Sequence, residues 1–133
     1  MSKFFVRAKC GKDVNLETVS VDIDNDAIDY KYLSSFINCD WIEVVKAKKL
    51  RHPYILIVDE EGLLKQNPIV NVVATCLYNS NNIKQGFISP ISGDVLVAKM
   101  VPDGEGAYDI SSLDKSDVDD VKAIITSELQ KLI

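Results

Sequence analysis

The densest group of side chains that could do chemistry is the run Asp59-Glu60-Glu61-Gly62, which places three carboxylates in succession. Clustered carboxylates can hold a hard cation or act as a general acid and base. The same residues also fit a plain turn, in which Asp59 accepts local backbone hydrogen bonds and Gly62 supplies the positive φ of a bulged hairpin. Because neighbouring side chains on a turn point apart, a metal site would need ligands from elsewhere in the chain. We therefore expect a structural turn.

A second acidic pattern, Asp22-x-Asp24-x-Asp26, resembles the start of a calcium-binding EF-hand loop. That loop requires Gly at its sixth position and Glu at its twelfth. This chain has Ala27 and Leu33 there. The calcium hypothesis fails, and the aspartates are better explained as the end of a strand and the cap of a helix.

Residues typical of nucleophilic or metal-assisted catalysis are sparse. The three cysteines, Cys10, Cys39 and Cys76, are widely spaced, and the single histidine, His52, completes no zinc site with them. No nucleophile-bearing turn is present, and Gly104-Glu105-Gly106 lacks the third glycine of a phosphate-binding loop. We expect reduced thiols, no cofactor, no metal and no enzymatic activity of the common kinds.

One basic cluster interrupts an otherwise acidic chain, and it consists of Lys46, Lys48, Lys49, Arg51 and His52. Nucleic acid could bind there, with Tyr54 or Trp41 stacking on bases. The net charge of −5 and the pI near 4.8 argue against general binding to phosphate backbones. We expect a solvated loop, and weak nucleic-acid binding through residues 46–51 remains an alternative.

Length and composition predict one globular domain spanning residues 1–133, because 47% of the residues are apolar and 26% are charged. The longest apolar runs are far shorter than a membrane span. The first residues carry no apolar stretch typical of a signal peptide. We expect a cytoplasmic protein that does not bind membranes.

Alternating and continuous apolar patterns predict five strands that position these groups. They cover residues 4–8, 18–23, 41–45, 54–58 and 95–98. The run Tyr54-Ile55-Leu56-Ile57-Val58 is apolar throughout, which is typical of a strand covered on both faces.

Apolar residues at helical spacing predict three helices. The first runs from Ile28 to about Asn38, with Asp26 as its N-cap. The second begins with Asn67 as N-cap and Pro68 in the first turn. The third begins at the pair Ser116 and Asp119. Together these elements predict an α+β fold, with a mixed, mainly antiparallel sheet of about five strands packed by three helices in the order β-β-α-β-β-α-β-α.

Four short segments occur in an order that resembles one protein family. They are Trp41-Ile42-Glu43-Val44-Val45, Ile57-Val58-Asp59-Glu60-Glu61-Gly62, Asn67-Pro68 with Asn71, and Ser92-Gly93-Asp94-Val95-Leu96-Val97. The chain is similar to the domain of unknown function 3846 family, small proteins encoded by bacteria, phages and conjugative elements. The resemblance implies an α+β domain and a mobile-element setting. It implies no established activity and transfers no functional residue.

We therefore expect a non-catalytic accessory protein that binds a macromolecular partner, most simply another protein, with Asp59, Glu60, Glu61 and Asn71 as the candidate interaction surface. The alternative is a metal-dependent or small-ligand-binding protein, even an enzyme, that uses the acidic turn. The sequence leaves the oligomeric state open.

Overall fold

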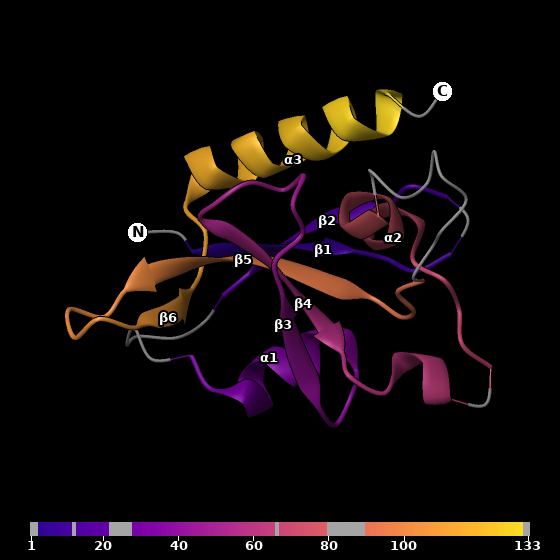
Figure 1. Cartoon of the computed structure of the whole chain (residues 1–133), viewed down its shortest axis with the longest axis horizontal. Coiled ribbons are helices and arrows are strands. Elements are labelled where there is room, and N and C mark those ends of the chain that lie inside the picture. Colours follow the sequence, from indigo (N-terminus) through magenta and orange to yellow (C-terminus); the bar gives the residue numbers. More distant parts are fainter. Residues whose placement is uncertain (1–2, 12, 22–27, 66, 80–89, 132–133) are drawn as a thin grey trace.

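The computed structural model describes residues 3–11, 13–21, 28–65, 67–79 and 90–131. They form a sheet that lies between helices on its two faces (Figure 1). The strands are β1 (Phe4–Ala8), β2 (Leu16–Ser20), β3 (Ile42–Val45), β4 (Tyr54–Asp59), β5 (Val95–Pro102) and β6 (Tyr108–Ser111). The helices are α1 (Tyr30–Ile37), α2 (Val72–Asn79) and α3 (Lys115–Gln130), with a short 3₁₀ helix, η1 (Gly62–Leu64).

All strand pairs of the sheet are antiparallel, in the spatial order β2-β1-β5-β4-β3. The sixth strand, β6, pairs with the second half of β5. The α+β class and the predicted order of elements are confirmed. The sequence patterns missed β6, a strand of only four residues that contains polar Asp109 and Ser111.

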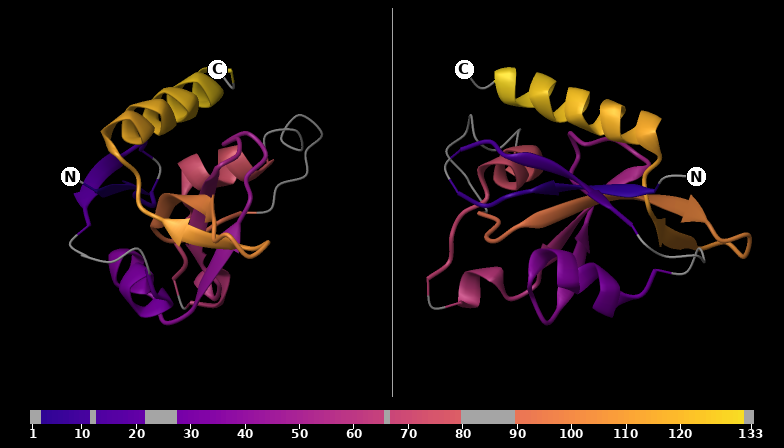
Figure 2. Two further views of the ribbon diagram at one scale, coloured as in Figure 1. Left: turned by 90° about the vertical axis from the view of Figure 1, so that its left-hand side faces the viewer. Right: turned by 180° about the vertical axis from the view of Figure 1, so that it is seen from behind.

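The interior strand β4 is buried on both sides, as its unbroken apolar run predicts. Leu56 and Val58 pack in the core with α2 and α3. Ile55 and Ile57 pack with α1 on the opposite face. Figure 2 shows α3 and α1 on opposite sides of the sheet. Burial on both faces explains why no polar residue interrupts this strand before Asp59.

Helix α1 begins two residues later than expected, at Tyr30 rather than Ile28. Its N-cap is Asp29, whose carboxylate accepts a hydrogen bond from the Tyr32 amide at 2.8 Å. Asp26, the predicted cap, lies outside the described residues, as do Asp22 and Asp24 of the calcium-like pattern. The left-handed backbone of Asn38, with φ of 53°, ends the helix.

The predicted start of α2 at Asn67 and Pro68 is wrong. Residues 69–71 run alongside residues 91–93 through the bonds Asn71 N–H to Ile91 O at 2.7 Å and Gly93 N–H to Ile69 O at 2.9 Å. Pairing with a neighbouring segment therefore replaces the first predicted helical turn. The helix begins at Val72.

The start of α3 is set by Asp114 and Asp117 rather than by Ser116 and Asp119. Asp114 accepts from the Asp117 amide at 2.9 Å, and Asp117 accepts from the Asp114 amide at 3.1 Å. This reciprocal pair is a capping box. Ser116 donates its hydroxyl to Asp114 at 2.7 Å. Across the described parts of the chain, no helix is both long enough and apolar enough to cross a membrane.

Candidate functional site

The acidic turn begins with a carboxylate that is already engaged. Asp59 is the last residue of β4, and its side chain is 6% exposed. One oxygen accepts a hydrogen bond from the Glu61 amide at 2.9 Å, and the other lies 2.8 Å from Lys65 Nζ. The bond to Asp59 raises the pKa of Lys65. The local hydrogen bond expected of Asp59 is present, and the ion pair with Lys65 adds to it.

Gly62 is required for a different reason from the one that we inferred. It is not among the residues with positive φ, and it starts η1 instead of closing a hairpin. A β-carbon on residue 62 would lie only 2.9 Å from the carbonyl oxygen of Ser92. The glycine therefore permits close contact between the turn and the segment that leads into β5.

The remaining members of the predicted interaction surface separate into two groups. Glu60 and Glu61 are exposed. Asn71 is completely buried, and its amide donates to the carbonyl oxygens of Ala8 and Gly93, both at 2.9 Å. Its side-chain oxygen accepts from the Ala74 amide at 3.0 Å and caps α2. Placing Asn71 on a surface was therefore wrong, because its side chain joins three segments inside the protein.

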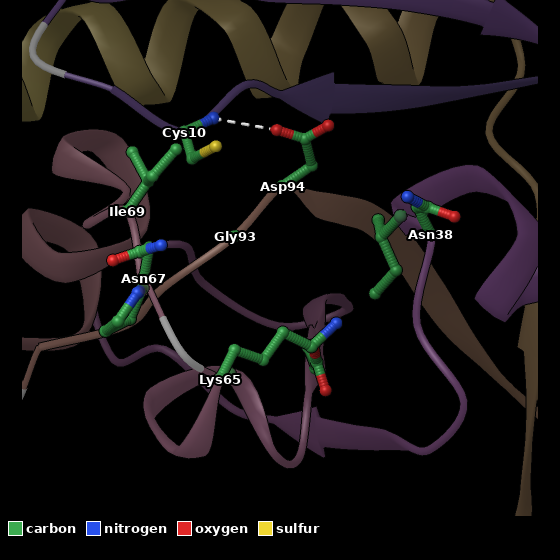
Figure 3. A pocket seen from close by; sticks show the side chains of 11 residues that line it. Cys10, Asn38, Lys65, Asn67, Ile69, Gly93 and Asp94 are labelled. Atoms are coloured by element: carbon green, nitrogen blue, oxygen red, sulfur yellow. Dashed lines mark hydrogen bonds and ion pairs between the residues drawn. The ribbon is translucent and has the colours of Figure 1, made fainter.

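Three of the four segments that carry the family resemblance meet around one pocket of about 270 Å³, the turn pocket (Figure 3). Its walls include Asp59, Gly62, Asn67, Pro68, Gly93 and Asp94, and Cys10 lies beside Asp94. The sequence could not show this convergence, because these segments are far apart along the chain.

Hydrogen bonds and an ion pair hold Asp94 at the wall of the turn pocket. It accepts from the Cys10 amide at 2.8 Å, the dashed contact in Figure 3, and lies 3.0 Å from Lys9 Nζ. Burial alone would raise the pKa of this carboxyl, but the bonds from Cys10 and Lys9 outweigh burial and hold it below its usual value. Burial, together with the nearby Asp94, raises the pKa of the Cys10 thiol. A protonated thiol is a poor nucleophile.

A larger depression of about 420 Å³, the edge groove, lies on the other side of the acidic turn. Its floor and walls come from β3, the end of β4, η1, α2 and the segment before β5, through Glu43, Val45, Val58, Asp59, Glu60, residues 62–64, Tyr78 and residues 90–92. Asp59 and Gly62 line both hollows. The turn thus forms the wall between the turn pocket and the edge groove.

Large apolar side chains are exposed around the edge groove. Leu63 is 54% exposed, Leu64 is 82% exposed and Tyr78 is 46% exposed. Leu64 in particular gains little from burial in the isolated chain, and an exposed apolar cluster is typical of an interaction site. The charged residues that line the groove within the described chain are all acidic: Glu43, Asp59 and Glu60.

The floor of the edge groove also contains an unusual polar group. Ser92 is 3% exposed, and its hydroxyl is buried without a hydrogen-bond partner in the described structure. Buried hydroxyl groups are normally paired, and an unpaired one costs about 1–3 kcal/mol.

The basic cluster forms a separate surface. Ala47 and Leu50 of this connection are buried and anchor it to the core, whereas Lys46, Lys48 and Arg51 are exposed. With His52, these three cations border a depression of about 140 Å³. Among the described residues, no three His, Cys, Asp or Glu side chains come together in a way that could hold a metal ion.

Sequence reasoning found the acidic turn but missed the edge groove. The available signal was Leu63-Leu64, an apolar pair directly after three carboxylates, in a position where a turn is usually polar. The other walls come from β3, α2 and residues 90–92, and only the fold brings them to the turn.

Comparison with known proteins supports the resemblance. The family model described as a domain of unknown function (DUF3846) matches residues 11–124. Searches of curated proteins and of solved structures found no match. The matched region extends from the connection after β1 into α3 and includes the acidic turn, the edge groove, the buried Asn71 and all of the turn pocket except Cys10. The chain therefore belongs to the DUF3846 family.

Proposed function

We propose that the protein is a non-catalytic accessory module that binds another protein through the edge groove. The observation that carries this proposal is the exposure of Leu63, Leu64 and Tyr78 around a 420 Å³ depression beside β3. Covering these side chains would remove apolar surface from water, which is a main driving force of protein association.

The nearby turn pocket supports catalysis less well. Asp59 and Asp94 each have a lysine partner at 2.8 and 3.0 Å, and the Cys10 thiol is held protonated. The two carboxylates are already engaged in ion pairs and hydrogen bonds, which join the ends of β4, η1 and β1 and the segment before β5. We therefore assign the turn pocket to the framework that shapes the acidic turn, and the edge groove to binding.

The mobile-element setting implied by the family resemblance belongs to the same proposal. The partner would be a protein of the host or of the element, encountered in the cytoplasm. An accessory role requires only a stable binding surface, which a framework of buried Asn71 and the Asp59–Lys65 ion pair can supply.

The test is a selection of random displayed peptides on the immobilised full chain. We expect enriched peptides whose affinity falls at least about tenfold on the variant Leu64→Asp, which places a charge in the apolar rim. Val14→Asp is the matched control, since Val14 is 54% exposed in the connection between β1 and β2. Failure to enrich any peptide, or equal binding to both variants, would overturn the proposal.

A further inference from the structure

The edge groove runs beside a strand whose outer edge has no strand partner among the described residues. Strand β3 is the last strand in the order and pairs only with β4 there. The other edge strands are β2 and the short β6, and both consist mainly of exposed and half-buried residues. An unpaired edge presents backbone donors and acceptors to another chain.

The register identifies which backbone groups β3 presents. The Glu60 amide donates to the Trp41 carbonyl at 2.9 Å, so residue 41 directs its backbone groups toward β4. Backbone direction alternates along an antiparallel strand. Glu43 and Val45 therefore also point toward β4, which leaves the backbone groups of Ile42 and Val44 directed outward.

The side chains of β3 define two different environments along this edge. Val45 packs with the core beneath α2 and lines the edge groove together with Glu43. Ile42 packs on the α1 face, and Val44, on that same face, is 37% exposed. A strand added to β3 would therefore meet an acidic residue at position 43 and apolar residues at positions 44 and 45.

We propose that β3 binds an extended segment of a partner protein as an additional strand, with a lysine or arginine opposite Glu43 and apolar residues opposite Val44 and Val45. This inference rests on the proposed function and names its partner class. Cross-strand neighbours of opposite charge, and pairs of apolar residues, stabilise strand pairing. Main-chain hydrogen bonds to Ile42 and Val44 provide affinity, and the flanking pockets provide specificity.

Charge favours this occupant over a second copy of the chain. Glu43 and Glu60 line the edge groove, and Glu61 follows them on the exposed turn. Two copies paired through their β3 edges would bring these acidic rims together, and like charges opposite each other destabilise a strand pair. A basic, apolar segment neutralises the rim instead.

The probes are two fluorescent peptides flanked by threonines, one containing valine-lysine-valine-valine and the other the reverse order. A parallel added strand selects the first peptide and an antiparallel one selects the second, since the lysine must face Glu43. Replacing lysine with glutamate should weaken binding at least about tenfold. The double variant Glu43→Lys with Glu60→Lys should reverse this preference, and the peptide affinity should fall with salt.

An N-methyl scan of the better peptide is the decisive measurement. Methylation of a backbone nitrogen removes its donor, so affinity should fall at every second position and remain within about threefold at the positions between. The control is the same scan on Leu64→Asp. If peptide binding is lost on Leu64→Asp but the methyl scan shows no period-two pattern, strand addition is overturned and the proposed function stays intact. Failure of both peptides to bind would also overturn this inference. The proposed function fails separately, if no displayed peptide is enriched.

Discussion

A β-carbon on Gly62 would lie 2.9 Å from the carbonyl oxygen of Ser92, so the acidic turn and the segment before β5 are in direct backbone contact. This contact sets the position of η1 and hence of Leu63 and Leu64. It also places Ser92 on the floor of the edge groove. One close approach of two main chains therefore shapes the proposed binding site.

The variant Gly62→Ala should destabilise the protein by about 1–3 kcal/mol, because the added methyl group must displace backbone rather than a flexible side chain. Chemical denaturation measures this change. Leu64→Ala in the same turn is the control and should alter the free energy of unfolding by less than about 0.5 kcal/mol, since Leu64 is 82% exposed. Equal stability of both variants would show that the Gly62–Ser92 contact is unimportant.

The variant Asn71→Ala should lower the free energy of unfolding by about 2–4 kcal/mol, because it leaves two carbonyl oxygens and the α2 cap without their partner. Asn67→Ala is the matched control, since Asn67 is exposed. Thermal and denaturant unfolding measure both. A near-neutral Asn71→Ala would contradict the structural role assigned here to this side chain.

Tyr54 should make the protein sensitive to alkali. Burial, followed by the carboxylates of Asp120 and Asp117, raises the pKa of Tyr54 above its ordinary value of 10.0. Its hydroxyl donates to Asp120 at 2.8 Å and contacts Asp117 at 3.2 Å. Because the native pKa is the higher one, the stabilisation is complete below pH 10 and is lost as the pH rises above it.

The variant Tyr54→Phe should cost about 1–3 kcal/mol at neutral pH and should show less of the alkaline loss. Denaturation at a series of pH values measures both effects. Tyr108→Phe is the control, because Tyr108 is 52% exposed. If wild type and Tyr54→Phe lose stability in parallel above pH 10, the Tyr54 hydroxyl is not the group responsible.

Asp94 should make the protein sensitive to acid, whereas Tyr54 makes it sensitive to alkali. Its pKa lies below the ordinary 3.8, so its contribution is present above that value and is lost as the pH falls toward the lower native pKa. Asp94→Ala should cost about 1.5–3 kcal/mol at neutral pH and should reduce the loss on acidification. Asp109→Asn, an exposed carboxylate on β6, is the control. Identical acid profiles of wild type and Asp94→Ala would contradict the assignment.

The sequence predicted the sheet and helices well where burial decides the pattern. The apolar run of β4 and the helical stripe of α3 are both set by the faces that they bury, and both are confirmed. The helix starts were less predictable because several polar residues could serve as caps. Asn71 rather than Asn67 caps α2, because Asn71 also bonds to Ala8 and Gly93, which are distant in sequence.

The functional site was less predictable than the fold. The acidic turn is visible in the sequence, but the partners of Asp59 and the contact of Gly62 with Ser92 come from tertiary structure. The edge position of β3 depends on the sheet order, which local patterns do not determine. An exposed Leu63-Leu64 pair was the only local indication of a binding groove.

Amide hydrogen exchange, measured by NMR on the full chain with and without the selected peptide, tests binding at the edge groove most directly. In the free protein, we expect the amides of Glu43 and Val45 to be protected by β4 and those of Ile42 and Val44 to exchange rapidly. Bound peptide should slow exchange at Ile42 and Val44, with the largest shift changes at Leu63, Leu64 and Tyr78. Unchanged exchange at Ile42 and Val44, with shift changes confined to the basic connection of residues 46–51, would contradict the account.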